Sequence, residues 1–160
     1  MRLWGFQKPE FIKNTTRLKA NAFGFYALNG RSIVDFKEHS KKEDVIEFLY
    51  KIRINNPDKE IILILDNFRS HKATKVALVA AEINITLIFL PPYSPDLNPI
   101  EFIWKSIKRL ISIHSVRDIE QIRTLIKDAF SRLSMKLSFA KKWIEEILPE
   151  PIKLGLTRLS

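Results

Sequence analysis

The chain of 160 residues contains no cysteine, has only four glycines and lacks any long apolar run. Without cysteine it can form neither a disulfide nor a thiolate zinc site, which fits an intracellular protein. Its apolar runs, such as Ile61 to Leu65, are far too short to span a bilayer as a helix. The residues after Met1 do not resemble a secretory signal. These absences predict a soluble protein of the cytoplasm, associated with the nucleoid if the host is prokaryotic.

Acidic residues are also scarce, with 18 Asp and Glu against 27 Lys and Arg, and the formal net charge is +9. Residues 1–31 carry six basic residues and one acid, and residues 105–142 carry ten against three. Residues 61–100, between these zones, carry three of each sign. This distribution predicts a polyanionic partner. A basic surface that is simply solvated is the alternative interpretation.

Hydrophobic spacing predicts the elements of secondary structure. A hairpin is expected over residues 20–36 with its turn at Asn29-Gly30. Further strands are expected over 60–65 and 83–90, both with a buried pattern. Helices are expected over residues 43–54, 71–82 (capped by Ser70), 100–111, 116–133 (with Ser115 and Asp118 as a capping box variant) and 139–148.

This order predicts an α/β fold, a mixed sheet with helices on both faces. In such sheets the chemistry lies beyond the carboxyl ends of the parallel strands. Asp66 directly follows the strand 60–65, although an Asp in this position is often only a turn residue or a helix cap. The neighbouring strand leads into the segment LPPYSPDLNPIE at the same edge.

That segment, residues 90–101, holds four of the chain's eight prolines and ends on Glu101. Proline restricts the backbone, so the segment is a stiff connector that aims the glutamate. Glu101 has two interpretations. With Asn98 as N-cap and Pro99 as the first helical residue, its carboxylate could bind the N-cap amide, and it faces Lys105 one turn on. Alternatively, Asp66 and Glu101 share Mg²⁺, which prefers one or two carboxylates together with water and phosphate oxygens.

The motifs LILDNFRSHKA (63–73) and LIFLPPYSPDLNPIEFIWKSIKR (87–109) resemble those of mariner-type and insertion-sequence DDE transposases. The resemblance extends over residues 4–111 and more loosely over the closing helices. It implies a ribonuclease H-like fold, with a catalytic domain over residues 1–111 and a helical extension of the same domain over 112–160. It also implies Mg²⁺ (or Mn²⁺) as cofactor, DNA of element ends and target as partner, and a homodimer, with no membrane and no small-molecule substrate.

The resemblance further implies that Asp66 and Glu101 are the second and third acids of a catalytic, metal-binding triad. Asn67 and His71 match positions that flank the second acid. For these two residues, an Asx-turn and an exposed histidine at a helix start remain alternative interpretations.

The first acid of the family lies on an opening strand, ahead of the segment that WGFQKP resembles. We therefore expect the central first strand to be missing, which would expose two ladder edges. A gene in two overlapping frames, an internal start or a decayed element would each explain this. Asp35 is not expected to replace the first acid, because it would lie three strands, about 14 Å, from Asp66.

The leading hypothesis is a transposase catalytic domain that cleaves DNA strands and transfers them. Lys105, Lys108 and Arg109 would bind DNA, and Arg117, Arg123 and Lys127 would extend the basic surface along the next helix. Because the first acid is absent, we expect the chain alone to be inactive. A truncated remnant that only binds DNA or dimerises is the main alternative. A cellular ribonuclease H-like nuclease is a weaker one, against which the proline motif argues.

Overall fold

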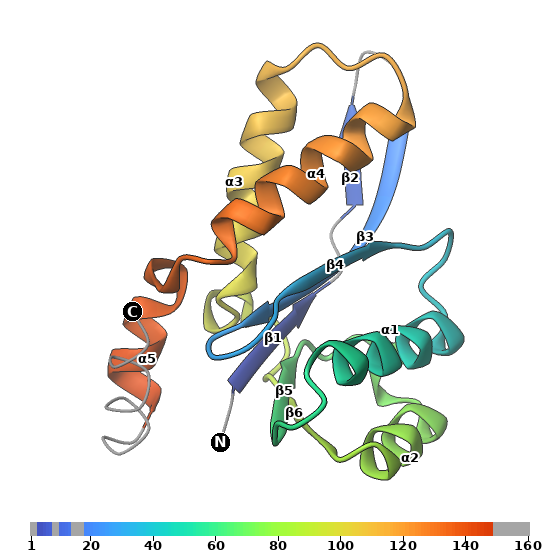
Figure 1. The fold of residues 1–160 in the computed structure, drawn as a ribbon, viewed down its shortest axis with the longest axis vertical. Helices are drawn as coiled ribbons and strands as arrows, with labels where there is room; N and C mark the ends of the chain where they lie inside the picture. Colours follow the sequence, from blue (N-terminus) through green and yellow to red (C-terminus); the bar gives the residue numbers. More distant parts are fainter. Residues whose placement is uncertain (1–2, 8–9, 14–17, 149–160) are drawn as a thin grey trace.

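The computed structural model describes residues 3–7, 10–13 and 18–148 (Figure 1). They form one six-stranded mixed sheet in which β5 pairs in parallel with both β1 and β6, and β3 pairs antiparallel with β1, β2 and β4. The strands are β1 (Leu3–Gln7), β2 (Glu10–Lys13), β3 (Leu18–Ala27), β4 (Ile33–Phe36), β5 (Ile61–Leu65) and β6 (Ile85–Phe89).

Helices cover both faces of this sheet, as the sequence predicted. α1 and α2 lie on one face, and α3 and α4 lie on the other (Figure 1). Within the described residues, every helix is too short or too polar to span a bilayer. The helices are α1 (Lys42–Asn55), α2 (Thr74–Glu82), α3 (Ile100–Ile113), α4 (Ile119–Leu133) and α5 (Lys141–Ile147), with 3₁₀ turns η1 (Arg69–Lys72), η2 (Pro95–Leu97) and η3 (Leu137–Ala140).

The expectation that the sheet lacks its central strand was wrong. β1 occupies the place between β3 and β5 and pairs in parallel with β5, with Phe6 opposite Leu65. The gap that would have left two open ladder edges is therefore filled. The sequence of β1, LWGFQ, nevertheless contains no acid. The central strand is therefore present, but it carries no carboxylate.

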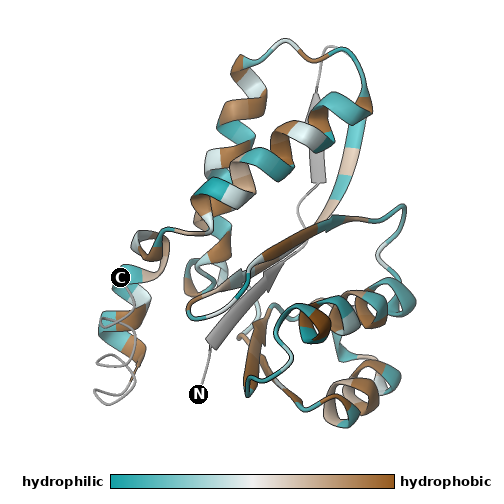
Figure 2. Ribbon diagram, in the orientation of Figure 1, coloured by the Kyte–Doolittle hydropathy of each residue, from teal (hydrophilic) through white to brown (hydrophobic). Residues whose placement is uncertain are grey.

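Successive side chains of β3 point to opposite faces of the sheet, and the core is therefore divided into two layers. Phe23 and Phe25 pack with α1 and α2, whereas Ala22 and Tyr26 pack with α3 and α4. Figure 2 shows hydrophobic and hydrophilic residues alternating along α3 and α4, whose apolar stripes face the sheet. All five residues of β5 are buried, as expected for a strand covered on both sides.

A single glycine allows α3 to approach the sheet closely. Trp104 is buried under α4, where its ring stacks on Phe130 with a centroid distance of 5.2 Å. Its other side lies over Gly24 in β3, where a Cβ atom would overlap the indole ring. The contact fixes α3 against the sheet and thereby places Glu101, in the first turn of the same helix.

Several boundaries differ from the predictions. α2 begins at Thr74 and not at residue 71, and its N-cap residue is Ala73, so Ser70 does not cap it. Residues 69–72 form a 3₁₀ turn, and the extended backbone of Ala73 (ψ 135°) separates that turn from α2. In α4, Asp118 itself is the cap and accepts from the Gln121 amide at 2.9 Å, so no capping box with Ser115 forms.

Two predictions about the strands also need correction. The hairpin of β3 and β4 exists, but Gly30 has no left-handed backbone, so the loop is not a tight Asn-Gly turn. Instead the Asn56 side chain holds the loop, accepting from the Arg31 amide and donating to its carbonyl. In β6 only Ile85 is buried, because the strand lies at the edge of the sheet and not inside it.

Candidate metal centre and nucleic-acid interface

Asp66 lies where β5 ends, at the edge where the parallel strands β1, β5 and β6 all finish. Its Oδ1 accepts a hydrogen bond from the Phe68 amide at 3.3 Å and lies 2.7 Å from Nδ1 of His71. Asp66 is thus a turn residue, as one interpretation predicted. The second carboxylate oxygen takes part in neither contact and stays available for a ligand.

His71 is buried to 2% exposure in η1, so its interpretation as an exposed histidine at a helix start was wrong. Its ring packs edge-on against Phe68, with centroids 5.6 Å apart. The imidazole is therefore held between the Phe68 ring and the Asp66 carboxylate. The Asx-turn considered for Asn67 is made by Asp66 instead.

Glu101 lies in the first turn of α3, but it does not cap that helix. The N-cap residue is Pro99, and the Asn98 amide donates to the Pro95 carbonyl at 3.0 Å. Oε1 of Glu101 is buried and has no hydrogen-bond partner among the described residues. Nor does Glu101 form an ion pair with Lys105 within the described part of the chain. The capping interpretation was therefore wrong.

Burial raises the pKa of the Glu101 carboxyl to about 7. The positive charge of Lys108 lowers this pKa, the negative charge of Asp66 raises it, and the charge of Lys105 lowers it. The charge of Asp66 thus acts on Glu101, although 34 residues separate the two acids in the sequence. A cation between them would relieve both the burial cost and the repulsion.

The two acids line one small pocket of about 140 Å³ at the end of β5. Asn67 lines it as well, and its Oδ1 is a second buried acceptor without a hydrogen-bond partner among the described residues. Two carboxylates and an amide oxygen are the hard ligands that Mg²⁺ and Mn²⁺ prefer. The proline segment forms the rest of the wall with Leu90, Pro91, Tyr93, Ser94, Pro95 and Asn98.

The residues present fit a cation, but they do not form a complete triad. In the described part of the chain, no group of three or more His, Cys, Asp or Glu residues could hold a metal ion. Phe6 of β1 pairs with Leu65 of β5, and Gln7 and Asp66 are the residues that follow this pair in the two parallel strands. The residue that follows this pair is therefore neutral in β1 and an acid in β5.

Tyr93 is a residue of this site that sequence reasoning missed. It lines the pocket, is fully exposed and has a left-handed backbone with φ of 58°. Such a conformation is rare for a bulky aromatic residue and points to a functional constraint. The crowding of prolines on both sides was the only available sign in the sequence. An exposed ring at the pocket offers a stacking surface for a nucleotide base.

Asp35 lies far from this centre, as predicted. It is on β4, which β3 and β1 separate from β5. Its carboxylate pairs with Lys51 and Lys37. Burial raises the pKa of Asp35, but hydrogen bonds from Lys51, the Phe36 backbone and Lys37 outweigh it, and the pKa is lowered. Asp35 therefore belongs to a structural ion-pair group.

Lys105, Lys108 and Arg109 are exposed on α3, on the turns that follow Glu101. The ammonium of Lys105 lies over the exposed ring of Phe102 at 5.5 Å. This arrangement offers positive charge and an aromatic face beside the pocket, which suits a phosphate backbone and its bases.

The basic residues of α4 have a different setting. Arg123 and Lys127 lie over the ring of Phe36, at 5.6 Å and 5.8 Å, and Arg123 also pairs with Glu120 at 2.8 Å. Part of their role is therefore to cover the sheet edge at β4. Arg117 is exposed just before α4.

Comparison with known families gives a match over residues 7–123, more than half of the chain, to the family described as DDE superfamily endonuclease. A Sinorhizobium fredii protein, Uncharacterized protein y4pE/y4sA, is 37% identical over 73 residues. That alignment covers 45% of this chain and 52% of the relative, so the chain matches about half of the relative's length.

Solved structures give the same fold. The catalytic domain of Mos1 transposase, in a structure with Raltegravir and Mg, has a TM-score of 0.67 at 15% identity, covering 81% of this chain and 71% of that one. The crystal structure of the Mos1 strand transfer complex has a TM-score of 0.67 at 13% identity, covering 84% and 52%. This similarity confirms the predicted ribonuclease H-like fold.

Proposed function

We propose, on the premise that this chain belongs to the DDE superfamily endonucleases, that it is the catalytic part of a transposase, which cleaves the DNA ends of a mobile element and joins them to a target. The observation that carries the proposal is the pocket shared by Asp66 and Glu101. The buried, partnerless oxygen of Glu101 favours a cation ligand over a helix cap. The Mos1 structures, one with Mg and one a strand transfer complex, support the cofactor and the DNA partner by analogy.

Each residue of the site has a separate role in this proposal. Asp66 and Glu101, with the amide oxygen of Asn67, would hold Mg²⁺ or Mn²⁺. When bound, such an ion stabilises charge on a phosphodiester and makes water or a 3′-hydroxyl a better nucleophile. His71 would keep Asp66 oriented, and Lys105, Lys108 and Arg109 would bind the DNA backbone near the pocket.

One observation favours a second function, in which the chain is a transposase remnant that only binds DNA or dimerises. β1 carries no acid, and the residue that follows the Phe6–Leu65 pair in this strand is Gln7. Catalytic groups that act as a unit lose most of their effect when one is missing. We therefore propose that residues 1–160 alone do not cleave DNA at a useful rate, and that an upstream segment bearing the first acid restores cleavage.

Two measurements test the function. Mn²⁺ binding, followed by electron paramagnetic resonance, should be detectable in the chain and lost in Asp66→Asn and Glu101→Gln. Cleavage of labelled element-end DNA should require the upstream segment, and Glu101→Gln in that longer protein should abolish cleavage while DNA binding persists. Binding of Mn²⁺ that neither substitution changes would refute the metal centre. Cleavage by the 160-residue chain that is lost on Asp35→Asn would show that Asp35 is the first acid.

A further inference from the structure

Strand β6 forms an outer edge of the sheet. Within the described residues it pairs with β5 and has no strand on its other side. The outward N–H and C=O groups of such a strand are a template for another strand, and natural edges usually carry charge or proline against this. The β6 sequence, ITLIF, contains neither. Instead Ile88 is 45% exposed and Phe89 is 36% exposed, so the edge is open and apolar.

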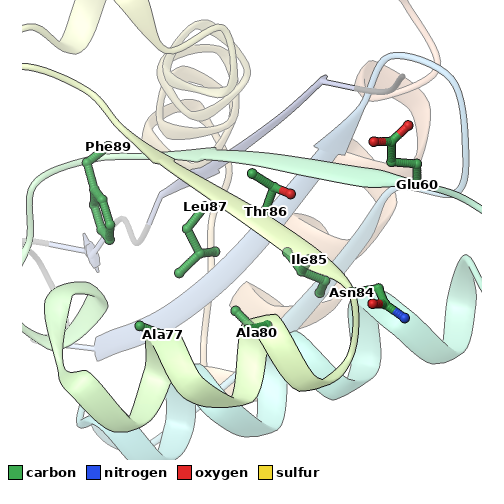
Figure 3. A pocket seen from close by; sticks show the side chains of 9 residues that line it. Glu60, Ala77, Ala80, Asn84, Ile85, Thr86, Leu87 and Phe89 are labelled. Carbon is green, nitrogen blue, oxygen red and sulfur yellow. The ribbon is translucent and has the colours of Figure 1, made fainter.

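A groove of about 640 Å³ lies beside this edge, between β6 and α2 (Figure 3). Ile85, Leu87 and Phe89 point toward α2, and the small side chains of Ala77 and Ala80 line the groove below them. Alanines leave room for side chains of an added strand. The groove therefore fits an extended, apolar segment that hydrogen-bonds along β6.

The charges at the two ends of β6 indicate which strand could pair with this edge. Glu60 and Glu82 are exposed near the Ile85 end, and Glu60 lines the groove. At the other end, Nζ of Lys72 lies 5.9 Å from the ring of Phe89. A strand with the same sequence and the opposite direction would bring each acidic end against a basic end.

We propose that β6 pairs antiparallel with β6 of a second copy of this chain and so forms a homodimer. With Leu87 at the centre, Thr86 of one copy lies opposite Ile88 of the other, and Ile85 lies opposite Phe89. The chain carries a net charge of +9, which makes copies repel each other over most surfaces. The uncharged strand with complementary ends is a surface where this repulsion is small.

Analytical ultracentrifugation of the purified chain tests the pairing. The wild-type protein should show a concentration-dependent monomer–dimer equilibrium, and Ile88→Lys should raise the dimer dissociation constant by about tenfold or more. Ile113→Lys, at a more exposed apolar position on α3, is the matched control and should leave the equilibrium unchanged. A wild-type chain that stays monomeric, or a dimer that Ile88→Lys does not weaken, would overturn the proposal.

Single cysteines test the register, because the natural chain contains none. A mixture of Thr86→Cys and Ile88→Cys chains should form a disulfide-linked dimer under mild oxidation, far more than either variant alone. Ile113→Cys chains supply the background level. Charge reversal gives an independent check: Lys72→Glu should weaken the dimer, and adding Glu82→Lys should restore it. Cross-linking at background level, or no rescue by the charge swap, would contradict antiparallel pairing of β6.

Discussion

Glu101 shows how a single buried carboxyl links stability to pH. Its pKa is about 7 in the folded, metal-free protein, against an ordinary value of 4.5. Between pH 4.5 and about pH 7, Glu101 keeps a proton in the folded state but has lost it in the unfolded state. The free energy of unfolding therefore falls as the pH rises through this window. Because the side chain is only half-buried and Lys105 and Lys108 face it, we expect a loss of about 1–2 kcal/mol.

The measurement is urea unfolding in the presence of a chelator at about pH 5 and about pH 8. Glu101→Gln should remove most of the decline, whereas Glu146→Gln, at an exposed position on α5, should leave it intact. An unchanged decline in Glu101→Gln would show that other groups cause it.

His71 gives a second prediction at the residue scale. Its Nδ1 lies 2.7 Å from Asp66, and the loss of a group that orients a ligand commonly weakens metal binding by about 10–100-fold. His71→Ala should therefore raise the Mn²⁺ dissociation constant by about tenfold. His71→Asn, whose amide nitrogen can occupy the place of Nδ1, should keep most of the affinity, and His71→Gln should not. Equal affinity in the Ala and Asn variants, at equal folded fraction, would exclude an orienting role.

At the scale of elements, the contact of α3 with β3 determines where Glu101 lies. Gly24→Ala would force a Cβ atom into the Trp104 ring and should destabilise the protein by about 2–3 kcal/mol. The double variant Gly24→Ala/Trp104→Phe should lose less than the sum of its single changes, because the smaller ring leaves room. Gly30→Ala, in the exposed loop, is the control and should change the free energy of unfolding little. Additive losses in urea unfolding would argue against this packing account.

The register of β1 against β5 gives a prediction about the missing acid. Gln7 and Asp66 follow the paired residues Phe6 and Leu65 in parallel strands, so we expect an acid at position 7 to join the two carboxylates of the pocket. Gln7→Asp should lower the Mn²⁺ dissociation constant by about tenfold, and Glu101→Gln should cancel this gain. Gln7→Asn is the neutral control. If Asp and Asn at this position bind Mn²⁺ equally, β1 does not deliver residue 7 to the metal centre.

At the scale of the whole molecule, we expect positive charge to control the proposed binding of DNA. Replacing both Lys105 and Lys108 with Gln should reduce the slope of log affinity against log salt by about two, because each phosphate contact releases close to one counterion. The pair Lys42→Gln/Lys75→Gln removes the same charge from α1 and α2, the helices on the opposite face of the sheet, and should change the slope less. Fluorescence anisotropy on duplex DNA measures both. Equal slopes for the two variants would mean that only net charge matters.

Elements with a local pattern of residues could be predicted from the sequence alone. The five apolar residues of β5 require a strand covered on both sides, and the stripe of α3 requires a helix packed on the sheet. The positions of Asp66 after a strand and of Glu101 after the stiff proline segment are local as well, whereas the role of the two acids as metal ligands was implied by the resemblance to DDE transposases. Such features depend on residues that are neighbours in sequence, and therefore they could be read without the structure.

Features that depend on partners distant in the sequence could be seen only in the folded chain. Strand pairing places LWGFQ at the centre of the sheet and leaves ITLIF at its edge, and neither position is encoded within those five residues. Burial of His71 and the orientation of Glu101 into the pocket likewise depend on the elements packed around them. Local propensity selects a strand or a helix, whereas long-range pairing and desolvation select the elements that pack beside it. These neighbouring elements bury Glu101 and so raise its pKa, and they leave the outer edge of β6 open.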